Sequence, residues 1–154
     1  MAADYDLSAQ ASSRVQAGYR PMFTVENEID FSEVNGGAGA GLGETVGAIN
    51  VYKGWLVHRV LLEVVTPEGA TQTFDVGDET DPNGFLDAVN GNAAAGTQYV
   101  TELALTDGTP NTVTGYSNGK IYAADDQIDV TATQACDTAV IKVVALVTDM
   151  NPQL

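Results

Sequence analysis

The sequence predicts an all-β protein, an antiparallel β-sandwich of about eight strands with a jelly roll as the leading topology. Short runs in which apolar and polar side chains alternate recur about every 8–14 residues along the chain. Turns rich in Gly, Asn and Asp separate these runs. Only one segment carries helix signals, whereas a fold of alternating strands and helices would need several.

The chain divides into an N-terminal arm and one domain. Its 154 residues are enough for a single domain with a substantial core, and a composition of 44% hydrophobic and 18% charged residues is typical of a globular protein. Residues 1–20 show no sustained apolar periodicity and are rich in Ala, Ser and Gln. We therefore expect an extended arm over residues 1–20 and a single β-sandwich domain over residues 21–154.

The first half of the domain is expected to contain four strands. The first begins at Phe23, where apolar residues alternate with acidic ones and Asn27 interrupts the pattern; a Gly-rich segment, residues 36–43, separates it from a second strand at 45–52. The third run, residues 55–66, is apolar on both faces, which indicates a central strand. One of its faces is predicted to carry Leu56, His58, Val60, Leu62 and Val64.

Residues 67–69, Pro-Glu-Gly, are turn residues, so the runs at 55–66 and 71–76 are expected to form a hairpin. A short helix is predicted near residues 82–89. Asp81 suits the N-cap and Pro82 the first helical position, and a short apolar stripe follows. Further strands are expected at 98–105, at 112–116, at 120–123 continuing into 127–133, and at 139–148.

Two motifs superficially suggest ligand binding. The Gly-rich segment at 36–43 lacks the Gly-Lys-Ser/Thr ending of a phosphate-binding loop, and no amphipathic helix follows it, so a mobile or adaptable loop is the better interpretation. Asp75, Asp78 and Asp81 recur at every third residue and offer oxygen ligands for calcium. Their spacing is not that of an EF-hand, and turn and cap roles explain Asp78 and Asp81 without a metal. The sequence leaves calcium binding open.

Catalysis is not indicated. His58 is the only histidine, and the chain has no Gly-x-Ser-x-Gly nucleophile motif. Cys136 is the only cysteine, which excludes an internal disulfide and favours folding in a reducing cytoplasm. We predict a protein that is not an enzyme and that has no catalytic residue, no cofactor and no required metal.

The net charge of the chain limits the kinds of molecule that it is expected to bind. Six Lys and Arg against 21 Asp and Glu give a net charge of -15. Asp4 and Asp6 balance Arg14 and Arg20, so all of this charge lies on residues 23–154. Such a body repels nucleic acid and anionic lipid alike, and no window approaches 18 consecutive apolar residues. We expect no nucleic-acid partner and no membrane partner.

Three segments, Asp75–Val89, Ala93–Thr97 and Gly119–Val130, together resemble small structural proteins encoded near the capsid genes of tailed phages. The resemblance covers most of residues 46–150. Proteins of this kind decorate or cement capsids, so the resemblance implies a β-sandwich subunit, often trimeric, on the outer capsid surface where capsomers meet. It assigns no catalytic or metal-binding residue.

The resulting hypothesis is a virion protein, made in the bacterial host cytoplasm, that acts as a homotrimer and binds the major capsid protein. A net charge of -15 suits the outside of a DNA-filled shell. The neutral arm is the candidate capsid contact because it carries Tyr and Arg, which are enriched at interface hot spots; these candidates are Tyr5, Arg14, Tyr19 and Arg20. The alternatives are a receptor- or glycan-binding head of a phage fibre and, with less support, a small hydrolase using His58.

Overall fold

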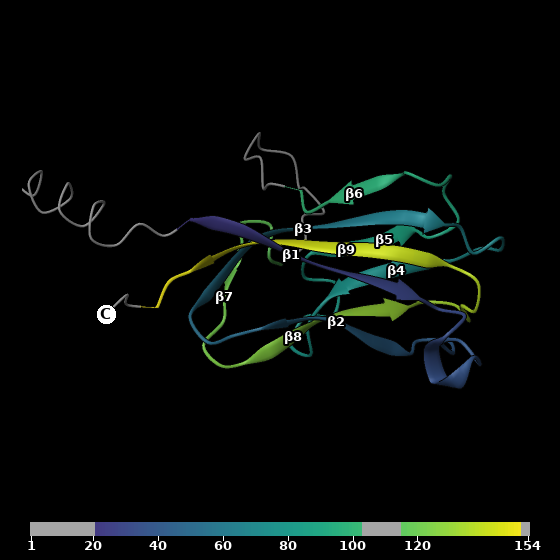
Figure 1. Cartoon of the computed structure of the whole chain (residues 1–154), viewed down its shortest axis with the longest axis horizontal. Helices are drawn as coiled ribbons and strands as arrows, with labels where there is room; N and C mark the ends of the chain where they lie inside the picture. The colour runs from purple at the N-terminus through teal and green to yellow at the C-terminus, as the bar shows by residue number, and fades with distance from the viewer. Residues whose placement is uncertain (1–20, 103–114, 152–154) are drawn as a thin grey trace, which may run out of the picture.

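The computed structural model describes residues 21–102 and 115–151 as two antiparallel sheets packed face to face (Figure 1). The five-stranded sheet has the order β1-β9-β3-β6, with β7 also paired to β3, and the four-stranded sheet has the order β2-β8-β4-β5. The strands of the first sheet are β1 (Met22–Asp30), β3 (Trp55–Thr66), β6 (Gln98–Val100), β7 (Lys120–Ile121) and β9 (Val140–Asp149). Those of the second are β2 (Thr45–Val51), β4 (Thr73–Gly77), β5 (Leu86–Asn90) and β8 (Asp126–Ala132). A 3-10 turn, η1 (Val34–Gly36), lies between β1 and β2.

The strand order is that of a jelly roll. β1 pairs with β9, β2 with β8, β3 with β6 and β4 with β5, and successive pairs alternate between the two sheets. A long antiparallel ribbon wound into two layers produces this order. The predicted all-β jelly-roll sandwich is therefore confirmed, with nine strands in the described residues, one of which is the two-residue β7.

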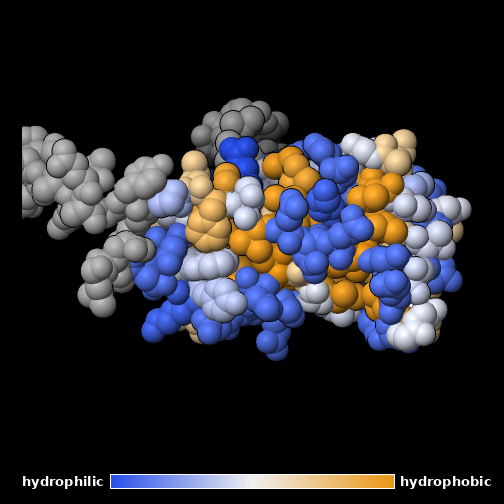
Figure 2. Space-filling view, viewed as in Figure 1, coloured by the Kyte–Doolittle hydropathy of each residue, from blue (hydrophilic) through white to orange (hydrophobic). Residues whose placement is uncertain are grey.

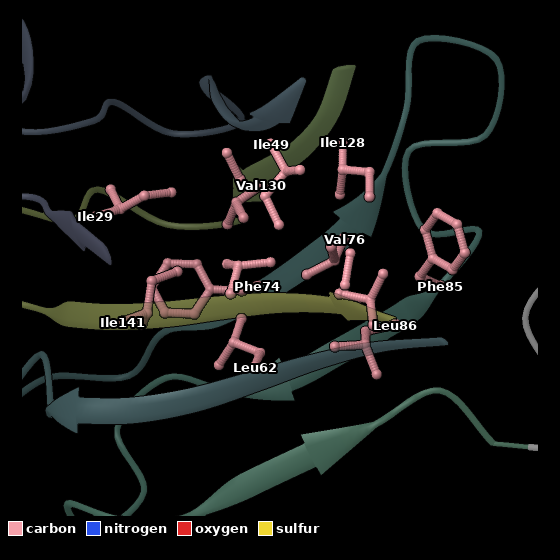
Figure 3. Close-up of a cluster of buried hydrophobic side chains, with 14 of the residues drawn as sticks. Ile29, Ile49, Leu62, Phe74, Val76, Phe85, Leu86, Ile128, Val130 and Ile141 are labelled. Carbon is pink, nitrogen blue, oxygen red and sulfur yellow. The ribbon is translucent and has the colours of Figure 1, made fainter. Parts of the chain in front are cut away.

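The core lies between the sheets and is built by the period-2 alternation of the strands. Figure 3 shows side chains from both sheets pointing toward one another, among them Phe74 and Val130 of the four-stranded sheet and Leu62 and Ile141 of the five-stranded sheet. The rings of Phe31 and Phe74 stack with their centroids 5.2 Å apart. Burying each such side chain contributes about 1.5–3 kcal/mol, so this layer is the main source of stability.

The prediction of a helix near residues 82–89 is wrong. Leu86–Asn90 is strand β5, and the residues before it form a turn. Leu86 pairs with Val76 and Val89 pairs with Phe74, so three steps on β5 oppose two steps on β4. This β-bulge directs Leu86 and Val89 into the core at a spacing of three residues, which imitates the periodicity of a helix.

Ala88 in this bulge has a φ of 50°, a conformation that costs a residue with a side chain about 1–2 kcal/mol. Its backbone N–H donates to the Asp75 Oδ1 at 2.7 Å, which holds the bulge in place. We expect Ala88→Gly to raise the free energy of unfolding by up to about 1 kcal/mol, because glycine adopts this φ without strain. Urea unfolding measures the change, with Ala132→Gly in regular β8 as the control that should lose stability.

Two further predictions are corrected. The runs at 55–66 and 71–76 do not form a hairpin, because β3 and β4 belong to different sheets and the turn between them carries the chain across the sandwich. The run predicted to continue from 120–123 into 127–133 is likewise divided, since β7 pairs with β3 while β8 lies in the four-stranded sheet. Turn residues mark where a strand ends, but they do not determine which strand it pairs with.

The predicted faces of β3 are also wrong over its first half. The register shifts between Val57 and Arg59, so His58 is the extra residue of a bulge. Val57 is fully buried together with Val60, Leu62 and Val64, while Leu56 and His58 are only half-buried. β3 does pair with other strands on both sides, as predicted for a central strand.

Several predictions fall wholly or partly outside the described residues. The arm over residues 1–20 is one of them, so the structure does not place its four candidate contact residues. The strand predicted at 98–105 is observed as β6 over Gln98–Val100, and the described end of the 112–116 run, Gly115 and Tyr116, lies in a turn.

Candidate functional site

The outer face of the five-stranded sheet carries large apolar side chains, although a solvated outer sheet face is normally polar. β9 alternates from Ile141 to Val147 between buried and half-buried residues, which directs Val144 outward. Val144 pairs with Leu61 of β3, which in turn pairs with Val100 of β6, so the outward row is apolar across three strands. We call this surface the apolar face; its large apolar side chains are Met22, Leu56, Leu61, Val100, Ile121, Val144 and Leu146.

Figure 2 shows this face, where hydrophobic side chains gather over β9 and β3 and hydrophilic ones cross between them. Met22 and Ile121 are each 60% exposed and Val100 is 41% exposed. The other four large apolar side chains of the face are half-buried. An accessible apolar surface of this kind is typical of a contact site for another molecule.

The outer face of the four-stranded sheet is different. Its outward residues are mainly Thr, Asn, Gln and Asp, and hydroxyl and amide pairs link them across the strands. Thr45 Oγ1 lies 2.9 Å from Thr131 Oγ1, and Gln127 Nε2 donates to Asn50 Oδ1 at 3.0 Å. The two outer faces of the sandwich are therefore chemically distinct, one apolar and one polar and acidic.

Positive charge also concentrates on the apolar face. The described residues contain four Lys and Arg, of which Lys120 is paired with Asp78 and Lys53 lies in the loop between β2 and β3. The other two, Arg59 and Lys142, both point outward from the five-stranded sheet. Acidic neighbours accompany them, so this face carries both signs of charge.

An aromatic cluster closes one end of the sandwich. Trp55 makes edge contacts with Phe23 at 5.2 Å and with Tyr52 at 4.9 Å between ring centroids. β1 begins and β9 ends here (Figure 1), and the backbone N–H of Met150 donates to Gly54 O at 2.8 Å. β1 thus begins at the aromatic end of the apolar face.

A buried carboxylate, Asp78, joins two distant segments of the chain. Its Oδ1 accepts hydrogen bonds from the backbone N–H groups of Thr80 and Asp81 at 3.0 and 3.1 Å and from Tyr116 OH at 2.9 Å. Its Oδ2 accepts from Tyr122 OH at 3.1 Å and forms an ion pair with Lys120. Burial alone would raise the pKa of Asp78, but these donors outweigh it and lower the pKa below its ordinary value.

Glu68 is a second buried carboxylate with a structural role. It accepts hydrogen bonds from the backbone N–H groups of Asp137, Thr138 and Ala139 at 3.1, 3.0 and 2.8 Å. Burial alone would raise the pKa of Glu68, but these hydrogen bonds outweigh it and lower the pKa below its usual value. Glu68 thereby links the β3–β4 turn to the β8–β9 turn.

The residues considered for calcium are not brought together. Asp78 holds Lys120, and Asp75 caps the bulge in β5. The carbonyl of Asp81 accepts from the N–H groups of Asp78 and Gly84, so Asp81 closes a turn and is not a helix cap. Within residues 21–102 and 115–151, no three His, Cys, Asp or Glu side chains are grouped so as to hold a metal ion.

His58 and Cys136 have structural surroundings. His58 Nε2 lies 2.8 Å from Thr148 Oγ1 on the outside of the five-stranded sheet. Cys136 is buried, and burial together with its hydrogen bond to Glu68 raises the pKa of the thiol to about 12, so it carries almost no thiolate near neutral pH. No helix in the described residues is long and apolar enough to cross a membrane.

The Gly-rich segment connects β1 and β2, as expected for a loop. Ala40 forms an isolated bridge with Cys136, and Gly39 has a φ of 75° with the Cys136 carbonyl 2.4 Å from where a Cβ would lie. Only glycine fits this close approach. A separate groove of about 390 Å³ lies between β5 and β6 and is lined in part by Leu86, Val89 and Tyr99.

The sequence interpretation missed the apolar face. The available signal was hydrophobicity on both sides of the runs at 55–66 and 139–148, which predicts a central strand whether the second side is covered by the same chain or by another one. The structure shows that the described residues cover only one side of β3 and β9.

No protein-family model matches the sequence, and no curated protein matches it. The structure is similar to chains in three solved phage capsids. A chain of the acid-stable capsid of Helicobacter pylori bacteriophage KHP30 has a TM-score of 0.53 and 16% identity, over 82% of this chain and 86% of that one. A chain of the cyanophage Pam1 capsid asymmetric unit has a TM-score of 0.56 and 13% identity, over 84% and 85%. A chain of the capsid of Ralstonia phage GP4 has a TM-score of 0.57 and 14% identity, over 86% of each chain. This protein therefore has a jelly-roll fold that also occurs in chains of phage capsids.

Proposed function

We propose that this protein is a virion component that binds the outer surface of a phage capsid and stabilises contacts between capsomers, as a decoration or cement protein. The observation that carries the proposal is a jelly roll shared with chains of phage capsids, in which one outer sheet face is apolar and the other polar and acidic. Such two-sidedness suits a protein with one surface against other proteins and one in solvent. The proposed partner is the major capsid protein, and the proposed assembly is a homotrimer.

Charge supports a position on the outside of the shell. The net charge of -15 lies entirely on residues 23–154, and packaged DNA would repel it. The four-stranded sheet directs Asp75 and Asp129 outward without a Lys or Arg on its strands. A surface of this composition is favourable in water and unfavourable against nucleic acid.

The arm is the proposed capsid contact. We expect deletion of residues 1–20 to leave the domain folded, because the core is built from residues 29–147, and to weaken binding to capsids at least ~100-fold. Co-sedimentation with particles lacking the protein measures binding, and circular dichroism measures folding. The simultaneous substitution of Tyr5, Arg14, Tyr19 and Arg20 by alanine is expected to reproduce most of the loss.

Replacement of Ser8, Ser12 and Ser13 by alanine is the matched control, since it changes the same arm without removing a large side chain. It should bind as the unaltered chain does. Undiminished binding after deletion of residues 1–20 would show that the arm is not the capsid contact, and no binding by the unaltered chain would contradict the proposed function.

A further inference from the structure

We infer that the apolar face is the surface through which copies of this chain pack against one another. The inference rests on the self-association in the proposed function and does not require capsid binding. Three features of the face support it: its apolar centre, its mixed charge and its area.

Apolar side chains run across the face from β9 to β6, and polar ones lie along its margin on β1; apolar surface bordered by polar side chains is the usual anatomy of a protein interface. The row Val144–Leu61–Val100 and the neighbouring Leu146 form the centre. Thr24 and Glu26 lie along β1 at one margin, paired with Leu146 and Val144. Burial of the centre against another copy removes apolar surface from water, while the margin stays hydrated.

The charges of the face favour a second copy as the occupant. Lys142 pairs with Glu28 of β1 on one side and with Glu63 of β3 on the other, and Arg59 lies on the same face. Around a two-fold axis the face meets itself, and around the three-fold axis of the proposed trimer one part of the face meets another part of it. In both cases the face must supply both signs of charge. The charged residues that point outward from the strands of the four-stranded sheet are all acidic, so two copies of that face would repel each other.

The area of the face is sufficient. The strands of this sheet have 9 residues in β1, 10 in β9, 12 in β3, 3 in β6 and 2 in β7. With a rise of ~3.4 Å per residue and a spacing of ~4.8 Å between strands, they present roughly 590 Å² per copy. Two such faces packed on each other bury about 1,200 Å² in total, at the lower end of the range of specific protein interfaces.

The test compares Val144→Lys with Thr131→Lys. Both positions are half-buried and point outward from a central strand, the first on the apolar face and the second on the four-stranded sheet. Val144 lies opposite Glu26, so the sheet itself accepts a lysine there. We expect Val144→Lys to weaken self-association on the order of 100-fold, because its ammonium would be taken out of water into the apolar centre of the contact.

Light scattering after size-exclusion chromatography measures the mass of the full chain. The unaltered chain and Thr131→Lys are expected to run as a multiple of 16.1 kDa, and Val144→Lys as a single 16.1 kDa chain. A monomeric unaltered chain at about 100 µM, or a folded Val144→Lys that assembles normally, would overturn the inference.

Amine labelling of the unaltered chain gives an answer even if Val144→Lys does not fold. Labelling of Lys142 should slow as the protein concentration rises through assembly, while labelling of exposed Lys53 should not; equal behaviour of the two lysines overturns the inference. Capsid binding is read separately. If the unaltered chain is a monomer that binds capsids and Val144→Lys does not bind them, the capsid occupies the apolar face and the inference is wrong. If the unaltered chain is an oligomer that does not bind capsids, only the proposed function is contradicted.

Discussion

Asp78→Asn is expected to lower the free energy of unfolding by about 3 kcal/mol, because it removes the charge from one partner of a buried ion pair. The Asp78 side chain is fully buried and that of Lys120 is 19% exposed, so the ammonium is left with little water to replace the carboxylate. The amide that replaces Oδ2 also turns a donor toward Tyr122 OH and Lys120 Nζ. Urea unfolding at neutral pH measures the loss.

The matched control is Asp129→Asn. Asp129 is half-buried, and burial together with the nearby carboxylates of Asp126, Asp78 and Glu79 raises its pKa. Removal of this charge should leave stability unchanged or increase it. If Asp78→Asn costs no more than Asp129→Asn, the ion pair does not stabilise the fold.

Acid titration tests the same pair with a defined sign. The pKa of Asp78 is lower in the folded protein than in the unfolded chain, so its stabilisation is complete above the unfolded pKa of about 3.9 and is lost as pH falls through the folded pKa. Lys120 does not oppose this trend, because its pKa is raised and it keeps its charge throughout the acidic range. The unaltered protein should therefore lose stability more steeply than Asp78→Asn below pH ~4.

Glu68→Gln is expected to cost about 2–3 kcal/mol. One carboxylate accepts from three consecutive backbone N–H groups, Asp137 to Ala139, and from the Cys136 thiol. An amide offers a single acceptor oxygen and no charge. With that oxygen in place of Oε2, the N–H of Asp137 faces an amide donor, and the remaining bonds lose the strength that the charge supplies. Thermal and urea unfolding measure the loss, and thiol labelling of Cys136 should become faster because the β8–β9 turn opens more often.

Glu44→Gln is the control for this substitution. Glu44 also accepts from a backbone N–H, that of Gly41 at 2.7 Å, and from Asn35 Nδ2 at 2.8 Å, and its pKa is lowered. It is exposed, however, so water replaces any bond that the amide fails to make. We expect little change in stability and unchanged Cys136 labelling; an equal loss in the two variants would show that burial of Glu68 is not the cause.

The partners of the two buried carboxylates, Asp78 and Glu68, could be predicted from the sequence only where they are close in the chain. The prediction that Asp78 closes a turn is confirmed, because Thr80 and Asp81 lie within two or three residues of it. The partner that matters most, Lys120, is 42 residues away and gives no local signal. Glu68 lies in a turn that the sequence predicted, but its hydrogen-bond partners come about 70 residues later in the chain.

The errors in the fold have related causes. The apolar stripe at residues 85–89 has the same spacing in a helix and in a bulged strand, and only the pairing of β5 with β4 distinguishes them. The turn at 67–69 was found, yet turn residues do not report whether the chain returns to the same sheet or crosses to the other. Both features depend on contacts between strands that are distant in sequence.

The sequence by itself determined the all-β class, the start of most strands, the turn residues and the concentration of the whole net charge on residues 23–154. These follow from local properties: alternation has a period of two residues, turn geometry is set by a few side chains, and charge is additive. The tertiary structure alone decided which strands share a sheet, where bulges shift a register, and which polar groups meet in the interior. It also showed that β3 and β9 have one side in the core and the other on the apolar face. The sequence could not decide this point, because a strand that is apolar on both sides arises whether its second side is covered by this chain or by another one.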